Sequence, residues 1–231
     1  MSKNKESHWI PLADLMTVLM IMFLFVSISF MINLKKQNEK NQSVISEFQK
    51  SKKELLKELN IEFKEDFKST KWNAVIDSNN LSIRFVNEAV MFDNNKSELK
   101  EEFRNILNDF FPRYLKIILQ KKYVDKIAEV RIEGHTSEIG GYDLNLKLSQ
   151  ERTIEVVTYL RNLIAYKSLN KEQTERMLYW LTANGLSSGR TIDKNGEYTY
   201  ISKLNPDEVK CRRVEFRIVT ASDKIINKFS K

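Results

Sequence analysis

The sequence has few of the residues that interrupt helices or cross-link small folds. Its 231 residues include one cysteine, three prolines, six glycines and two histidines. The single cysteine, Cys211, excludes an intrachain disulfide framework and a zinc site built on cysteines. All six glycines lie at or after position 134, so the first half of the chain lacks the commonest interruption of helices. The length allows one ordinary domain with a tail or linker rather than two full domains.

The charge of the chain is only mildly unbalanced. Lys and Arg number 38 against 31 Asp and Glu, which gives a net charge of +7. A basic excess first suggests nucleic acid, but here it is spread thinly and forms no patch, so no direct nucleic-acid partner is expected. The sequence also has no phosphate-binding glycine loop, no metal-ligand cluster and no nucleophile with an accompanying base. It therefore predicts neither an enzyme nor a protein with a bound cofactor.

One long apolar run lies near the N-terminus. Residues 10–32, IPLADLMTVLMIMFLFVSISFMI, carry a single charged residue, Asp14. As a helix they extend about 34 Å, enough to cross a hydrocarbon core of about 30 Å. A removable signal peptide is the alternative, because Lys3 and Lys5 precede the run, but the run exceeds the usual ~7–15 apolar residues and no A-x-A cleavage site follows. The sequence predicts one uncleaved transmembrane helix after an N-terminal segment, residues 1–9. Basic residues flank it on both sides, so charge does not decide its orientation.

Asp14 is the most informative residue of this span. An ionised carboxylate inside hydrocarbon costs at least about 2.5 kcal/mol, so the neutral form is favoured there and the group is suited to binding and releasing a proton. An interfacial position is the alternative, since Asp14 lies only about 6 Å into the helix, near water and the positive helix end. Thr17, one turn further on, could share the hydrogen-bond network of Asp14.

The span is followed by a charged segment, residues 33–70. It is rich in Glu, Lys and Gln and predicts a helical stalk of about 57 Å. Its apolar residues recur at spacings of three, four or seven, apart from a break at Lys52, which leaves a short coiled coil and a solvated linker as alternatives. These apolar positions are Ile45, Phe48, Leu55, Leu59, Phe63 and Phe67.

From residue 71 to residue 231 the pattern changes to alternating strands and helices. Strands are expected at 81–86, 127–133 and 211–219, the last of which begins with Cys211. Helices are expected at 97–121, with an interruption near Pro112, and at 146–166 and 171–183. This alternation predicts an α/β layer sandwich of about 150 residues.

Residues 132–152, IEGHTSEIGGYDLNLKLSQER, contain the best candidate binding site of this domain. A strand leads into Gly134-His135-Thr136, a Gly140-Gly141 turn follows, and a helix then presents Asn145, Leu148 and Arg152 at near-helical spacing. A polar loop with an arginine on the next helix is suited to binding a carboxylate-bearing ligand. The alternative is a structural loop whose polar groups cap the helix, with Arg152 in a surface ion pair. We expect His135 to be a structural member of the loop rather than a catalytic base.

The stretch HWIPLADLMTVLMIMFLFVSISF resembles the transmembrane segment of the MotB-type stator subunits, and Asp-Leu-Met-Thr followed by a Phe/Leu/Met run looks closest to the ZorB type of the Zorya anti-phage system. The resemblance implies that Asp14 carries protons, with sodium as an alternative ion. It also implies that the helix pairs with a second copy inside a ring of MotA/ZorA-like multi-helix subunits. The N-terminus would be cytoplasmic and the C-terminal domain periplasmic, on the inner membrane.

The distal domain resembles the OmpA C-terminal domain, which binds the peptide stem of peptidoglycan. The motif G-H-T-D followed by N-x-x-L-S-x-x-R is matched at Gly134, His135, Thr136, Asn145, Leu148, Ser149 and Arg152, and Arg212-Arg213-Val214-Glu215 matches the late R-R-V-E strand. The resemblance covers about Val90 to Val219. The ligand-binding residues that it implies are His135, Thr136, Ser137, Asn145, Leu148, Arg152 and Arg212.

Two positions depart from the OmpA pattern. Ser137 stands where the family usually places a ligand-binding Asp, and Leu144 stands where an aromatic residue commonly precedes Asn145. Glu138 could supply the missing carboxylate, and binding of diaminopimelate is expected to be weakened or altered.

Together the resemblances imply a peptidoglycan-anchored subunit that couples proton flow to rotation of its partner and serves anti-phage defence. A passive anchor between membrane and cell wall that conducts no ions, and a flagellar stator subunit, are the alternatives.

Overall fold

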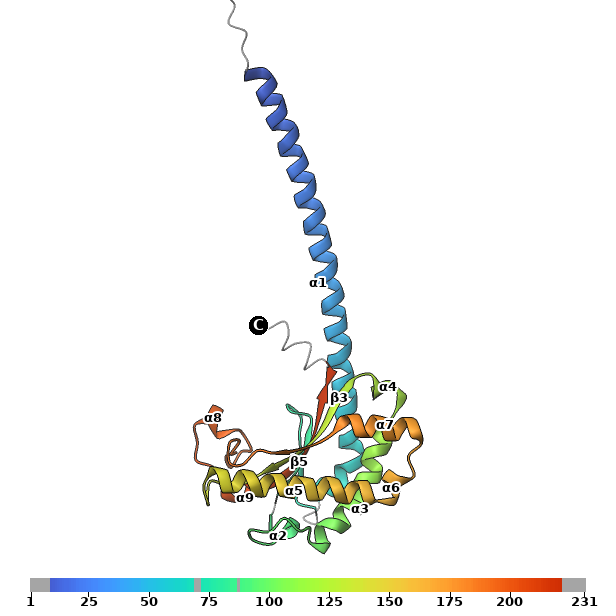
Figure 1. Cartoon of the computed structure of the whole chain (residues 1–231), viewed down its shortest axis with the longest axis vertical. Helices are drawn as coiled ribbons and strands as arrows, with labels where there is room; N and C mark the ends of the chain where they lie inside the picture. The colour runs from blue at the N-terminus through green and yellow to red at the C-terminus, as the bar shows by residue number, and fades with distance from the viewer. Residues whose placement is uncertain (1–8, 69–71, 87, 222–231) are drawn as a thin grey trace, which may run out of the picture. The chain divides into compact units, whose positions relative to one another are not determined.

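The computed structural model describes residues 9–68, 72–86 and 88–221, and the chain divides into two compact units. The first unit is Met1–Glu47 and the second is Phe48–Lys231. Helix α1 (Trp9–Lys68) supplies all the described residues of the first unit and continues into the second (Figure 1). Most of the predicted cytoplasmic segment, residues 1–8, lies outside the described residues.

The apolar side chains between residues 12 and 34 of the first unit are exposed within the chain. Of the described helices, only α1 is long and apolar enough to cross a membrane, and no residue of its most apolar window is buried. Large side chains such as Phe23, Phe25 and Phe30 each expose about two thirds of their surface. Exposed apolar area on this scale is unfavourable in water, so this part of α1 needs lipid or another protein around it. The predicted N-terminal apolar helix is confirmed.

The second half of the predicted stalk is part of the folded domain. Leu55, Leu59 and Phe63 follow one another at four-residue spacing on α1, and all three are buried in the core of the second unit. Arg113 forms ion pairs with the same stretch of α1. Its guanidinium lies 2.7 Å from the Glu62 carboxylate and 2.9 Å from that of Asp66. Helix α1 continues through Lys52, where the apolar spacing breaks. Residues that face their own domain cannot also form the seam of a coiled coil, so the coiled-coil interpretation of these three positions was wrong.

A five-stranded sheet forms the centre of the second unit, in the order β1-β2-β5-β3-β4. The strands are β1 (Ala74–Asp77), β2 (Ser82–Val86), β3 (Ile127–His135), β4 (Leu181–Gly185) and β5 (Arg213–Thr220). All neighbouring pairs are antiparallel except β3 and β4, which run parallel. The connection between those two strands contains the long helix α5 (Tyr142–Asn162), as a parallel crossover requires. The predicted α/β sandwich is confirmed.

Helices lie around this sheet in the second unit (Figure 1). Besides α5, the second unit contains α2 (Glu88–Met91), α3 (Glu101–Ile118), α4 (Lys121–Val124), α6 (Ile164–Lys167), α7 (Lys171–Trp180), α8 (Thr199–Ser202) and α9 (Glu208–Cys211). The core between α3 and the sheet is aromatic. The ring centroid of Phe110 lies 5.2 Å from that of Phe85 on β2 and 4.9 Å from that of Phe216 on β5. Edge-on pairs of this kind add about 0.5–1.5 kcal/mol each beyond the burial of their area.

Pro112 lies inside α3 without interrupting it, so the prediction of a helix break near Pro112 was wrong. A proline in a helix removes one backbone hydrogen bond and costs about 3 kcal/mol. Here it is flanked by Phe110, Phe111 and Tyr114, all of them fully buried. Burial of each such side chain contributes about 1.5–3 kcal/mol, which offsets the cost.

Several other boundaries differ from the sequence expectations. The helix expected at 171–183 ends at Trp180, because Leu181 begins β4 and pairs with Val130 of β3. The helix expected at 146–166 begins earlier, at Tyr142, and ends at Asn162. Cys211 ends α9 instead of beginning a strand, and its buried sulfur accepts a hydrogen bond from the Ile192 N–H. Strand β1 has only four residues and was missed.

Candidate functional site

The loop between β3 and α5 is held in place by hydrogen bonds from both sides. Asn145 donates from its side-chain amide to the carbonyl oxygens of Ser137 and Ile139, at 3.1 and 2.8 Å. The Thr136 N–H donates to the Ser187 carbonyl at 3.0 Å. A Cβ at Gly134 would come within 2.6 Å of the Ser149 carbonyl oxygen on α5, so only glycine allows this close approach of strand and helix. The motif predicted from the sequence therefore forms one rigid corner.

Two arginines of the predicted site converge on one carboxylate. Arg152 on α5 places Nη2 2.5 Å from Oε1 of Glu88, and Arg212 places Nε 2.9 Å from Oε2 of the same residue. We refer to Arg152 and Arg212 as the arginine pair. Glu88 is the first residue of α2, and nothing in the sequence pattern drew attention to it.

Arg152 is the more deeply held member of the arginine pair. Its residue exposure is 3 %, and it donates from Nε to the Lys96 carbonyl at 3.0 Å. Its guanidinium also lies 4.7 Å from the ring centroid of Phe92. Burial lowers the pKa of Arg152 from its usual value, although Glu88 acts in the opposite direction. A guanidinium fixed by the backbone and by an aromatic face is preorganised to receive a carboxylate.

Most of the other predicted ligand-binding residues are buried. His135, Thr136, Ser137 and Asn145 each expose 5 % or less of their surface. Leu148 is half-buried, whereas Leu144 and Glu138 are exposed. The structure thus brings the loop, α5 and the arginine pair together. It gives His135 and Asn145 internal positions, and their predicted contact with ligand stays a prediction. The structural-loop alternative expected polar groups to cap the helix and Arg152 to form a surface ion pair, but no described side chain caps α5 and Arg152 is buried.

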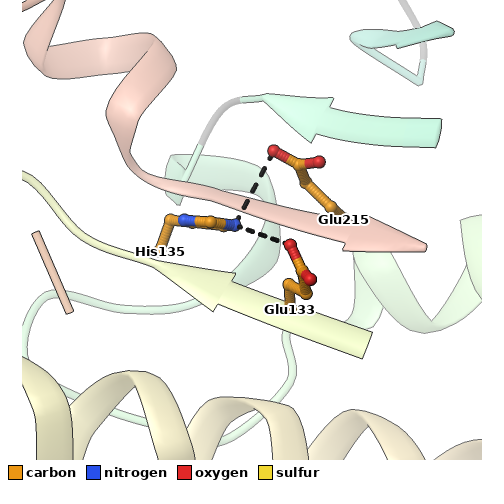
Figure 2. A group of neighbouring side chains, drawn as sticks. All are labelled: Glu133, His135 and Glu215. Carbon is orange, nitrogen blue, oxygen red and sulfur yellow. Dashed lines mark ion pairs between the residues drawn. The ribbon is translucent and has the colours of Figure 1, made fainter. Parts of the chain in front are cut away.

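A buried ionic cluster lies on the sheet face opposite the aromatic core. Glu133 and His135 come from β3, and Glu215 comes from β5; the imidazole lies between the two carboxylates, with Nε2 3.7 Å from each (Figure 2). Arg213 donates from Nε to Oε1 of Glu215 at 2.7 Å, and Arg84 on β2 lies 3.2 Å from the same oxygen. We refer to these five residues as the buried ionic cluster. All of them are at least 90 % buried.

The register of the sheet explains how these charges meet. Glu215 on the central strand β5 pairs with Arg84 on one side and with Glu133 on the other. Two carboxylates directly opposite each other repel, so the cluster needs its arginines. Burial alone raises the pKa of Glu215, but the neighbouring cations, Arg213 foremost, lower it to about 2. Glu215 is therefore a charged member of the cluster, held by its partners.

Glu133, His135 and Glu215 could also be considered as metal ligands. One ligand atom from each lies within 4.8 Å of the others, which suits a small divalent cation by distance. The charges do not fit. Oε1 of Glu215 is already bonded to Arg213, and Arg190 and Arg217 lie 3.5 and 3.7 Å from the Glu133 carboxylate. A dication would add two positive charges to carboxylates that arginines already neutralise.

Asp14 and Thr17 lie on the exposed surface of α1 in the first unit. The Thr17 hydroxyl donates to the backbone carbonyls of Ala13 and Asp14, at 3.0 and 2.8 Å. This bonding satisfies the hydroxyl hydrogen within the helix and leaves an oxygen lone pair able to accept a hydrogen bond. The predicted support of Asp14 by Thr17 stays a prediction.

Comparison with known proteins covers nearly the whole chain. The OmpA family model matches residues 91–199. The Zorya protein ZorB of the Escherichia coli Crooks strain is 35 % identical over 96 % of this chain and 92 % of its own length. The chain belongs to the ZorB family. A second Zorya protein ZorB, from Escherichia coli O139:H28, is 26 % identical over 79 % of this chain and 73 % of its own length.

A solved structure agrees with the fold of this ZorB-family chain. A MotB-like protein of Desulfovibrio vulgaris has a TM-score of 0.50 and 18 % identity, and the match covers 76 % of this chain and 94 % of that one. At this identity the likeness concerns the fold alone. Together with the apolar part of α1, the OmpA-family domain gives the architecture of a stator-like membrane anchor.

Sequence reasoning missed two features of this ZorB-family site. Glu88 lies 64 residues from Arg152 and has no local spacing that marks it as a partner. The buried ionic cluster did leave a signal. Charged residues alternate along both predicted strands, at Glu129, Arg131 and Glu133 and at Arg213, Glu215 and Arg217. Such alternation is typical of a solvated face. Only the structure shows that Glu133, Arg213 and Glu215 are buried.

The stability of the domain is expected to fall as the pH drops from 6.5 to 4. Burial, and then the charge of Arg213, lowers the pKa of His135 from 6.5 to about 4, although Glu133 and Glu215 act in the opposite direction. The unfolded state therefore binds a proton in this window that the folded state does not, which destabilises the fold by up to about 3 kcal/mol. Unfolding of the full chain in urea at pH 7 and pH 4.5 measures this loss.

A His135→Gln variant serves as the control for this pH dependence, because glutamine does not titrate. Its unfolding free energy should change less than that of the wild type between pH 7 and pH 4.5. An equal change in both proteins would show that His135 is not the group responsible.

Proposed function

We propose that this ZorB-family chain is the ion-carrying and wall-anchored subunit of a membrane motor that serves anti-phage defence. The observation that carries the proposal is the position of Asp14, the only charged residue of the apolar span, in a chain that matches a Zorya protein ZorB over almost its full length. In this proposal two copies of the chain stand inside a ring of MotA/ZorA-like subunits. The N-terminus is cytoplasmic and the second unit is periplasmic.

The side-chain chemistry of the span supports proton transfer through Asp14. The surrounding side chains of α1 are apolar and offer no positive partner for a carboxylate. Protonation removes a charge that hydrocarbon disfavours, so the protonated and ionised states favour different surroundings for the helix. At a membrane potential of about 150 mV, each proton that crosses supplies about 3.5 kcal/mol. That energy is comparable with a modest repacking of helices, and a ring around the anchored helices can turn by such steps.

The second unit supports anchoring by peptidoglycan. The arginine pair is preorganised beside the loop of the OmpA motif, and guanidinium groups bind the carboxylates that peptide stems carry. A passive anchor would need only this part of the molecule. A motor needs Asp14 as well, so replacement of Asp14 distinguishes the two functions.

Replacement of Arg152 by alanine is expected to weaken peptidoglycan binding by about 10- to 100-fold, because charge-assisted hydrogen bonds contribute about 1.5–3 kcal/mol. Co-sedimentation of the detergent-solubilised full chain with purified cell-wall sacculi measures the effect. Because Arg152 is buried, Arg212→Ala is made in parallel. Arg212 has a side-chain exposure of 33 %, and its loss should disturb the fold less.

The matched control is Arg161→Ala, which removes an exposed arginine from the same helix. That variant should sediment as the wild type does. Unchanged binding of both Arg152→Ala and Arg212→Ala would contradict the assignment of the arginine pair to the wall ligand.

A further inference from the structure

Glu88 occupies the groups that a ligand carboxylate would need. Each of its two carboxylate oxygens faces a different member of the arginine pair, at 2.5 and 2.9 Å. This is the bridging arrangement that an incoming carboxylate would adopt with the same guanidinium groups. The chain thus places a carboxylate of its own in the site.

Glu88 is not the main support of Arg152. That arginine is held independently by the Lys96 carbonyl, by the Asp93 carbonyl at 3.4 Å and by the ring of Phe92. Removal of Glu88 would leave the guanidinium oriented but unneutralised. An arginine in that condition attracts another carboxylate.

The exposed fractions of the three side chains show from which side a ligand could approach. The side chain of Arg152 exposes 4 % of its surface, that of Glu88 exposes 13 % and that of Arg212 exposes 33 %. The arginine pair therefore opens to solvent on the side of Glu88 and Arg212. Two positive charges face one negative charge in this group, so a second carboxylate is attracted even before Glu88 leaves.

We propose that Glu88 is an internal competitor for the arginine pair. It sets how tightly a carboxylate ligand must bind in order to displace it. This inference rests on the proposed wall binding. A tethered carboxylate acts at a high effective concentration, so a single free carboxylate competes poorly with it. A peptidoglycan polymer presents many stems and additional contacts, and it can displace Glu88. The chain would then bind assembled cell wall in preference to free fragments.

The test is Glu88→Gln in the full-length, detergent-solubilised chain. Glutamine keeps the size of the side chain and removes its charge, so the amount of sacculi that gives half-maximal sedimentation should fall at least ten-fold. Free diaminopimelate at millimolar concentration should compete with sacculi for the variant but not for the wild type. Glu98→Gln is the matched control, because Glu98 makes an exposed ion pair with Arg104 in the same part of the chain and should leave binding unchanged.

Glu88→Asp covers the case in which Glu88→Gln does not fold. Aspartate keeps the negative charge, but it is one methylene shorter and should bridge both arginines poorly, so tighter binding is again expected. Equal or weaker binding by the folded variants, with normal binding by the wild type, overturns the inference alone. Weaker binding would show that Glu88 supports ligand binding instead of competing with it. If neither wild type nor variants sediment, the wall-binding proposal itself is overturned, and the inference with it.

Discussion

Replacement of Asp14 by asparagine is expected to reduce phage protection to the level of cells that lack the chain. Asparagine has nearly the same shape as aspartate and stays neutral, so helix packing should be kept while proton binding is lost. In a motor driven by proton flow, loss of the only titratable group in the span stops every step. The effect should therefore be all or nothing rather than graded.

The efficiency of phage plating measures this result in a strain that carries the neighbouring genes. The membrane level of the variant must match that of the wild type. Ser27→Ala is the matched control, because it removes one polar group from the same span without removing a titratable one, and it should protect normally. Full protection by Asp14→Asn at a normal membrane level would instead favour the passive anchor.

Replacement of Glu215 by alanine is expected to lower the unfolding free energy by about 3 to 5 kcal/mol. Glu215 is fully buried, and its carboxylate accepts hydrogen bonds from Arg213 at 2.7 Å and from Ser82 at 2.9 Å. Removal of one partner from a buried group of ions leaves the other charges uncompensated, which strongly destabilises the fold. Since typical domains are stable by only about 5–15 kcal/mol, this single change approaches complete unfolding.

Urea unfolding followed by tryptophan fluorescence measures this loss, because Trp72 and Trp180 are both buried in the second unit. Glu172→Ala is the control, since Glu172 forms an exposed ion pair with Arg176 and should contribute at most about 0.5 kcal/mol. If Glu215→Ala lost no more stability than the control, the buried ionic cluster would not hold the strands together.

The sequence alone was sufficient to predict the features that depend on a local pattern of residues. An uninterrupted apolar run specifies a spanning helix whatever the rest of the chain does, and the loop motif from Gly134 to Arg152 is contiguous enough to be recognised. The strand at 81–86 and the long helix after the loop follow from the same local periodicities, to within a few residues.

Features that depend on distant partners could not be read from the sequence. Leu55, Leu59 and Phe63 have the spacing of a coiled coil, and only the packing of α1 shows that they face their own domain. Strand β4 exists because β3 lies beside it. Glu88 belongs to the site only because it contacts Arg152 and Arg212. These residues lie far along the chain, so no motif contains all three.

Proton uptake tests the central claim most directly. Vesicles that contain the chain and the proposed ring-forming partner, loaded with a pH-sensitive dye, should acidify when an inward proton gradient and membrane potential are applied. We predict acidification with the wild type and none above background with Asp14→Asn at equal protein content. Equal acidification by both would contradict the assignment of Asp14 as the proton carrier.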